Sequence, residues 1–287
     1  MKYKLLWIIL LIRCTSAENN IPNNTPAVNK IETDSLSKYS YDLVGFKYTR
    51  DSVQPENSTC FFIKKNGHLF LVTAKHSITG CKNGKVSLNR PDTMYVMKKG
   101  TETETEVLVI VNLLNINKDG VICLPAEEDP DVKVMEVFAI PTTYAAINSV
   151  DKFLKNRADK AGDVEMFGFP WQSHYRKDTF IYPPPTHLFM SIEDITVADK
   201  STFEATGKVD SINYRFVFNK PQTYIDYKGF SGSPVFFTDM TTGEKSIQGV
   251  FAQVTRDSVT KIQRSLEACK IEYVTKQIDS IILKIPR

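Results

Sequence analysis

One stretch of eight residues constrains this chain more than any other, because it sets a serine on a turn that leads into an apolar strand: Gly229-Phe230-Ser231-Gly232-Ser233-Pro234-Val235-Phe236. Its glycines permit a sharp bend and a positive φ. Such a bend exposes the Ser231 hydroxyl beside the backbone N–H groups of Gly229 and Ser231. A nucleophile next to two donors is the arrangement that acyl transfer needs. The same letters also fit an ordinary hairpin turn, so the interpretation depends on partners elsewhere.

The composition is that of an ordinary folded protein. The chain has 287 residues, of which 42% are hydrophobic, enough for one large or two small β domains. Its formal charge of +3 comes from Lys2, Lys4 and Arg13 in the first 17 residues, and the remainder is neutral. A neutral chain offers no electrostatic surface for nucleic acid. We therefore expect no nucleic-acid partner.

Residues 1–17 have the pattern of a secretory signal: two lysines, the apolar run 5–12, and small residues ending at Ala17. The apolar run is too short to span a bilayer. We expect cleavage near Ala17, a secreted or periplasmic mature protein, and no stable membrane insertion. The alternative is a lipoprotein signal that uses Cys14. Arg13 argues against it, because small residues are expected before a lipidated cysteine.

Residues 18–40 are polar and interrupted by prolines, which predicts a flexible lead-in. From Tyr41 on, short apolar runs alternate with turn residues. The clearest unit is a hairpin with strands at 60–63 and 68–73 around Asn66-Gly67. Further strands are predicted at 107–114, 120–124 and 132–140. The apolar residues Val274, Ile278, Ile281 and Ile282 follow helical spacing instead, which predicts a C-terminal helix.

Two candidate partners for the serine lie upstream. His76 follows an apolar strand and enters a short turn, and Asp119 directly precedes another apolar strand. Taken singly, such a histidine is more often structural, and Asp119-Gly120 is a common turn pair. No His-Glu-x-x-His, Cys-x-x-Cys or phosphate-binding glycine motif offers a competing chemistry. We therefore expect no metal and no cofactor.

Taken together, the three segments resemble the chymotrypsin-like serine proteases, in the order His, Asp, Ser. The shared motifs are Thr-Ala-x-His, Asp-x-small-aliphatic and Gly-x-Ser-Gly-Ser-Pro-Val. They are most similar to bacterial glutamyl endopeptidases and related exported trypsin-like peptidases, as are the segments 162–170 and 224–227. The resemblance covers about residues 44–284. It implies an all-β fold of two antiparallel six-stranded β-barrels, at 41–145 and 146–287, with a C-terminal α-helix.

The same resemblance implies a role for each site residue. Ser231 is the nucleophile, His76 the base, and Asp119 the carboxylate that orients His76. The N–H groups of Gly229 and Ser231 form the oxyanion hole. The implied function is a secreted, monomeric serine endopeptidase that cleaves protein or peptide substrates through an acyl-enzyme. The alternatives are a silent binding protein that keeps the fold, and an esterase or other acyl hydrolase on the same fold.

Substrate preference is weakly marked. Ile225 stands six residues before the nucleophile, where trypsin has the aspartate of its specificity pocket, and Asp226 beside it is a candidate. The strand 247–254 lacks the histidine with which the glutamyl branch reads acidic side chains, so glutamyl preference is not supported. Its part from Gly249 on offers a backbone edge to an extended substrate. Phe251 on this strand is a pocket candidate for which ordinary packing is the preferred interpretation.

Four cysteines remain once Cys14 leaves with the signal: Cys60, Cys81, Cys123 and Cys269. An even number in an exported chain fits disulfides. Cys60 and Cys81 lie on either side of His76, and this resembles the histidine-loop disulfide of the trypsin family, which implies a Cys60–Cys81 bond. The state of Cys123 and Cys269 stays open.

Overall fold

The structure is a computed structural model that describes residues 36–48, 53–82, 85–86, 91–99, 105–113, 130–137, 147, 149–150, 162–170, 175–176, 179–180, 185–191, 195–198, 201–202, 209–210, 213–222, 227–256, 259–260 and 262–285. All of them belong to one compact unit, Ser35–Arg287. The predicted signal and residues 18–35 of the lead-in lie outside the described residues. Among those described, no helix is long and apolar enough to cross a membrane.

The first sheet has six antiparallel strands in the order β7-β6-β1-β2-β3-β8. Their bounds are β1 Tyr41–Tyr48, β2 Val53–Lys65, β3 His68–Thr73, β6 Thr93–Lys99, β7 Thr105–Asn112 and β8 Lys133–Glu136. Asn66 and Gly67 both have positive φ, at 53° and 82°. These are the angles of a tight hairpin turn between β2 and β3, so the predicted hairpin is confirmed.

Three short elements follow β3. The helix α1, Lys75–Thr79, carries His76 and ends at Gly80, whose φ of 66° is left-handed. The two-residue strands β4, Cys81–Lys82, and β5, Lys85–Val86, then pair with each other.

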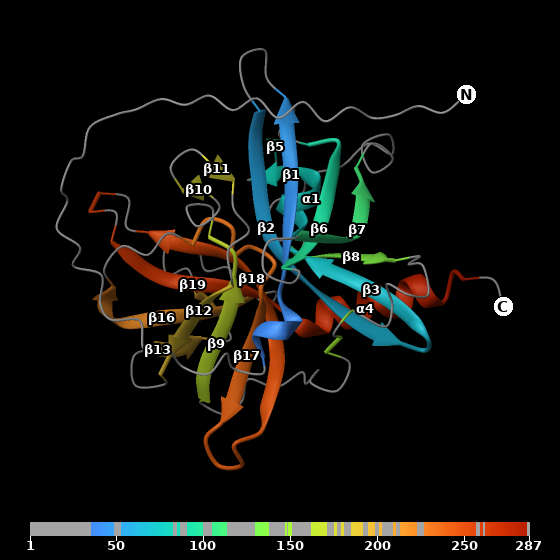
Figure 1. The fold of residues 1–287 in the computed structure, drawn as a ribbon. Coiled ribbons are helices and arrows are strands. Elements are labelled where there is room, and N and C mark those ends of the chain that lie inside the picture. The colour runs from blue at the N-terminus through green and yellow to red at the C-terminus, as the bar shows by residue number, and fades with distance from the viewer. Residues whose placement is uncertain are drawn as a thin grey trace, which may run out of the picture. The chain divides into compact units, whose positions relative to one another are not determined.

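The second sheet is antiparallel, in the order β12-β9-β17-β18-β19-β16-β13. Its strands are β9 Gly162–Gly168, β12 Thr186–Met190, β13 Ile195–Ala198, β16 Asn213–Gln222, β17 Pro234–Asp239, β18 Lys245–Arg256 and β19 Gln263–Lys270. Two small hairpins pair β10 Tyr175–Arg176 with β11 Thr179–Phe180, and β14 Ser201–Thr202 with β15 Val209–Asp210. The chain ends in the helix α4, Ile271–Ile282, which contacts β8 (Figure 1).

The second sheet curls on itself. Its outer strands β12 and β13 lie at opposite edges, yet only four residues separate them in sequence. Five Cα steps span at most about 18 Å, so the two edges must approach each other. Counted as one interrupted strand, β12 and β13 complete a curled sheet of six. The predicted fold class, two antiparallel six-stranded half-barrels with a C-terminal helix, is confirmed.

Strand β2 shows how the halves are joined. Alternate residues of a strand face opposite sides, and here both sides are buried. Phe62 faces the interior of the first sheet, whereas Phe61 and Ile63 face a second apolar cluster. That cluster also contains residues from β17, β18 and α4, among them Phe236, Ile247, Val250, Val274 and Ile278. The two sheets and the helix therefore share one core.

Both ends of the described chain pack on this shared core. Val274 and Ile278 are buried in it, and Ile281 and Ile282 pack against it, so the predicted apolar stripe of the helix is confirmed. The last residues of the predicted lead-in also belong to the folded body. Residues Ser37–Tyr39 form a 3₁₀ turn, and Leu36 is buried.

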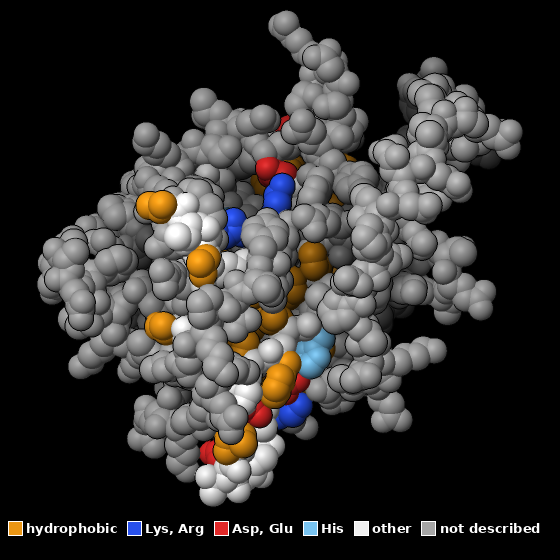
Figure 2. Space-filling view, turned by 90° about the vertical axis from the view of Figure 1, so that its left-hand side faces the viewer, with side chains coloured by type: hydrophobic (Ala, Val, Ile, Leu, Met, Phe, Trp, Pro, Cys, Tyr) orange, Lys and Arg blue, Asp and Glu red, His pale blue; other side chains and the backbone are white. Residues whose placement is uncertain are grey.

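A buried carboxylate ties three strands together on the outer face of the second sheet. Glu165 of β9 accepts hydrogen bonds from His187 of β12 and Lys245 of β18, each at 3.1 Å. The His187 ring stacks on Phe167, with ring centroids 4.5 Å apart. The hydrogen bond from His187, opposed by burial and supported by Lys245, lowers the pKa of Glu165 to about 2. Figure 2 shows a face of the molecule where a histidine lies beside hydrophobic and charged side chains.

The predicted Cys60–Cys81 disulfide is wrong, because Cys60 is a free thiol. Cys60 lies opposite Thr73 in the β2–β3 ladder, and its side chain is fully buried in the first sheet's interior, with Tyr41 and Leu71. Burial, and after it the charge of Asp42, raise the pKa of the Cys60 thiol. Cys269 is also buried and likewise forms no disulfide, and Cys123 lies outside the described residues.

Candidate active site

The turn that carries Ser231 has the backbone that its glycines predict. Gly229 and Gly232 have φ of 98° and 91°, values that residues with a Cβ rarely adopt. Space excludes a side chain as well. A Cβ on Gly229 would lie 2.1 Å from the Phe169 carbonyl oxygen, and one on Gly232 would lie 2.0 Å from the Thr59 carbonyl oxygen. The turn is therefore pressed against β2 on one side and the end of β9 on the other.

Ser233 fixes the direction of the Ser231 N–H. The carbonyl of Phe230 accepts two hydrogen bonds from Ser233, one from its N–H at 2.9 Å and one from its buried hydroxyl at 2.6 Å. In a trans peptide the N–H points opposite to the C=O, so the Ser231 N–H is turned away from Ser233. Within the described part of the chain, neither this N–H nor that of Gly229 donates to an acceptor. In the described part of the chain, both N–H groups of the predicted oxyanion hole are therefore without an acceptor.

Thr59 of β2 holds the turn from the first sheet. Its N–H donates to the Ser231 carbonyl at 2.8 Å, and its hydroxyl donates to the Gly229 carbonyl at 2.8 Å. The same hydroxyl accepts a hydrogen bond from the Phe169 N–H at 3.3 Å. The Thr59 carbonyl in turn accepts from the hydroxyl of Thr73. Thr59 of the first sheet therefore holds the turn that carries Ser231 through two carbonyls, those of Gly229 and Ser231.

The carboxylate of Asp131 makes two contacts with His76. The His76 ring Nδ1 lies 2.6 Å from Asp131 Oδ2, and the His76 backbone N–H donates to Asp131 Oδ1 at 2.9 Å. Ala74, the N-cap of α1, makes no side-chain cap, so Asp131 also satisfies one of the open amides at the start of this helix. The two contacts set both the position of α1 and the orientation of the imidazole.

The environment of Asp131 keeps it ionised. Burial by itself would raise the pKa of this carboxyl, but the charge and hydrogen bonds of His76, with a smaller contribution from Lys75, hold it below its ordinary value. About a quarter of the Asp131 side chain and a third of that of His76 stay exposed, 27% and 31%. An ionised acceptor on Nδ1 leaves Nε2 as the nitrogen that can take a proton.

The sequence analysis predicts Asp119 as the carboxylate that orients His76; Asp119 lies outside the described residues, so this stays a prediction, and the described carboxylate that contacts His76 is that of Asp131. The ladder between β3 and β8 explains the position. Thr73 pairs with Lys133, so continuing the antiparallel register brings Asp131 opposite Lys75, next to His76. A signal for Asp131 was present in the sequence, because it directly precedes Val132-Lys133-Val134, an alternating apolar and polar strand start.

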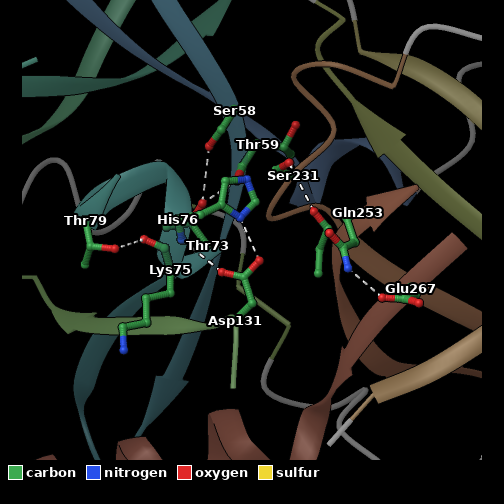
Figure 3. Close-up of polar contacts among 11 residues, drawn as sticks. Ser58, Thr59, Thr73, Lys75, His76, Thr79, Asp131, Ser231, Gln253 and Glu267 are labelled. Carbon is green, nitrogen blue, oxygen red and sulfur yellow. Dashed lines mark hydrogen bonds and ion pairs between the residues drawn. The ribbon is translucent and has the colours of Figure 1, made fainter. Parts of the chain in front are cut away.

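The segments that carry Ser231 and His76 lie against each other, since a Cβ on Gly232 would lie 2.9 Å from the backbone nitrogen of Ala74, the N-cap of α1. Figure 3 shows Ser231 beyond the edge of the His76 ring that does not face Asp131. The Ser231 hydroxyl, which is partly exposed, donates a long hydrogen bond of 3.4 Å to the Ala252 carbonyl. A nucleophile and base that stand close without a short hydrogen bond are common before substrate binds.

The predicted substrate residues have three different outcomes. Asp226 lies outside the described residues. Gly249 is paired with Val235 of β17 and with Lys270 of β19, so its backbone is no open edge, contrary to the prediction for the strand's beginning. The ladder with β17 ends at Val250, and from Ala252 on the described pairing of β18 is with β19 alone. The edge beside Ser231 therefore begins at Ala252.

Phe251 is a packing residue, as the preferred interpretation held. It is 1% exposed and contacts Tyr227 in the interior of the second sheet, with ring centroids 6.1 Å apart. Burial raises the pKa of Tyr227 to about 12. The Phe251 backbone supports the nucleophile turn, because its carbonyl accepts from the Gly232 N–H and its N–H donates to the Ser233 carbonyl. Among the described residues, no group of three His, Cys, Asp or Glu side chains could hold a metal ion.

The two curled sheets and the C-terminal helix make up the chymotrypsin-like fold. A solved structure with this fold, a thermostable serine protease AL20 from an extremophilic microorganism, matches 87% of this chain and 99% of its own, with a TM-score of 0.50 and 10% sequence identity. At that identity the likeness establishes the fold alone. No protein-family model matches the sequence. No curated protein matches it either.

Proposed function

We propose that this protein is a serine endopeptidase in which Ser231 is the nucleophile, His76 the general base and Asp131 the carboxylate that orients it. The observation that carries the proposal is the double contact of Asp131 with His76, beside a serine turn whose Gly229 and Ser231 N–H groups are available. A merely structural histidine does not explain a partly exposed serine next to it on a turn with two N–H groups that have no acceptor among the described residues. The fold shared with a serine protease agrees with this assignment.

Each step of peptide cleavage then has a group to perform it. Ser231 Oγ attacks the carbonyl carbon while His76 Nε2 takes its proton, and Asp131 stabilises the imidazolium. The carbonyl oxygen becomes an oxyanion that accepts hydrogen bonds from the Gly229 and Ser231 N–H groups, each worth about 10²–10³-fold in turnover. His76 returns the proton to the leaving amine, which leaves an acyl-enzyme. Water, deprotonated by His76, hydrolyses the ester and restores Ser231.

The edge of β18 favours a peptide substrate over a small ester. From Ala252 on, no described strand pairs with β18 on the side of the serine turn, and an extended peptide can add there as a further strand. The Ala252 carbonyl that now accepts from Ser231 lies at the start of this edge. Glutamyl specificity receives no support, since residues 247–254 contain no histidine. Cleavage of a signal near Ala17, and export, complete the proposal.

A fluorophosphonate probe tests the proposal directly. Purified mature protein is expected to form one adduct, located at Ser231 by mass spectrometry, and Ser231→Ala and His76→Ala are expected to form none. Asp131→Asn is expected to slow labelling about 10⁴-fold because the wrong tautomer of the imidazole is favoured. Asp119→Asn is the matched control and should react as the wild type does.

Three results would overturn parts of this assignment. A folded wild type that never labels supports the silent binding protein. Labelling that Asp119→Asn abolishes and Asp131→Asn leaves intact would reassign the carboxylate. A labelled enzyme that cleaves p-nitrophenyl esters but no member of a broad peptide library would support the esterase.

A further inference from the structure

The outer edge of β8 is covered by a side chain instead of a strand. β8 is the last strand of the first sheet, and an edge strand carries unpaired N–H and C=O groups along its free side. Gln277 of α4 pairs with two of them. Its Oε1 accepts from the Val134 N–H at 3.1 Å, and its Nε2 donates to the Val132 carbonyl at 3.0 Å. The amide thus binds the strand as the peptide group of a neighbouring strand would.

These two hydrogen bonds allow one orientation of the amide. Turned by 180°, Gln277 would set its NH₂ against the Val134 N–H and its oxygen against the Val132 carbonyl. Apolar contacts surround the pair, because Val132 and Val134 belong to the same buried cluster as Val274 and Ile278 of α4. The helix therefore presents an amide where the outer edge of β8 offers a donor and an acceptor together.

The anchored segment begins one residue after the carboxylate that holds His76. Asp131 is followed directly by Val132, whose carbonyl Gln277 holds. The Val132 N–H bonds back to the Pro130 carbonyl at 2.7 Å, which bends the chain at Asp131. The position of the carboxylate thus depends on a strand end whose only neighbouring strand among the described elements is β3.

We propose that Gln277 is a positioning residue for the active site, one that holds Asp131 against His76 from the C-terminal helix. The inference rests on the proposed function for its catalytic consequence. Without the two hydrogen bonds of Gln277, the segment Val132–Val134 is no longer anchored to α4. Asp131 can then move, which lengthens its 2.6 Å contact with His76. A misplacement of about 1 Å can cost about 10²-fold in rate. A carboxylate that moves away also stabilises the imidazolium less.

The test compares Gln277→Leu with Ser280→Leu, which introduces the same residue at an exposed position of the same helix. The rate of fluorophosphonate labelling is measured from pH 4 to 9, after circular dichroism has shown that each variant is folded. Gln277→Leu is expected to label about 10- to 100-fold more slowly, with the acid limb of its pH profile moved to lower pH. Gln277→Glu keeps an acceptor for the Val134 N–H but repels the Val132 carbonyl. Its labelling rate is expected to lie between those of the wild type and Gln277→Leu. Ser280→Leu is expected to match the wild type.

A second readout does not depend on activity. A proton shared between His76 Nδ1 and Asp131 is expected to give a downfield NMR signal in the wild type, and Gln277→Leu is expected to broaden or shift it. If the wild type fails to label but this signal changes in Gln277→Leu, the positioning role stands and the proposed function fails. If a folded Gln277→Leu keeps both the wild-type pH profile and the wild-type signal, the positioning role is overturned.

Discussion

Replacement of Thr59 by valine tests how the first sheet supports the nucleophile turn. Valine keeps the shape of threonine and removes the hydroxyl, which is fully buried. The Gly229 carbonyl would lose its donor and the Phe169 N–H would lose its acceptor. Each buried polar group left without a partner costs about 1–3 kcal/mol. We therefore expect Thr59→Val to lower the free energy of unfolding by about 2–4 kcal/mol.

The same change should slow the reaction beyond its effect on stability. The hydroxyl of Thr59 holds the Gly229 carbonyl. Without this hydrogen bond the backbone at Gly229 can turn, and the Gly229 N–H, one of the two proposed oxyanion donors, can change direction. A donor that is no longer aimed at the oxyanion costs up to about 10²–10³-fold in rate. Thr59→Ser is the control, because it keeps the hydroxyl and removes one methyl group, at a cost of about 1 kcal/mol.

Urea unfolding measures the stability of the three proteins, and fluorophosphonate labelling below the unfolding transition measures their reactivity. The expected order for both quantities is wild type, Thr59→Ser, Thr59→Val, with the larger step at valine. Equal stability and equal labelling of Thr59→Val and the wild type would refute the role given to this hydroxyl.

Three further changes probe the Ser231 turn and the buried carboxylate of Glu165. Gly232→Ala should destabilise the fold by more than about 2 kcal/mol in thermal unfolding, because its Cβ would meet the Thr59 carbonyl at 2.0 Å at a φ of 91°; a well-folded variant contradicts this. Ser233→Ala removes one of two donors to the Phe230 carbonyl and should slow fluorophosphonate labelling about tenfold, because the Ser231 N–H is then less firmly aimed; folding is retained, and unchanged labelling contradicts the prediction. The Glu165 pKa is about 2 in the fold against an ordinary 4.5, so its stabilisation is complete above pH 4.5 and lost as the pH falls to 2. Glu165→Gln should lack this pH dependence in urea titrations, and an unaltered dependence would show that Glu165 is not its source.

Features of this fold that depend on neighbouring residues were predictable from the sequence. The bend at Ser231 follows from glycines that tolerate positive φ. The β2–β3 hairpin follows from Asn66-Gly67. The C-terminal helix follows from apolar residues at helical spacing. In each case a few adjacent residues determine the backbone, so a local pattern is sufficient evidence.

Features that depend on pairing between distant segments were not predictable in the same way. Asp119 and Asp131 both precede apolar runs in the sequence, and the ladder between β3 and β8 is what brings Asp131 beside His76. The disulfide prediction failed for a related reason. Spacing along the chain brings Cys60 near His76, but strand alternation turns its side chain into the first sheet's interior. Strand register decides which aspartate lies beside His76, and the side of the strand on which Cys60 lies decides whether it can form a disulfide. Neither property can be determined from neighbouring residues alone.

The supports of the site cross between the two sheets in both directions. The nucleophile turn belongs to the second sheet, yet Thr59 of the first sheet holds it. Asp131 leads into the first sheet, yet Gln277 of the helix that continues the second sheet anchors the strand behind it. Each half therefore holds a group that the other half contributes. Because neither His76 with Asp131 nor the Ser231 turn is fixed by its own sheet alone, the proposed nucleophile and base reach their positions only once both sheets and α4 have packed on their common core.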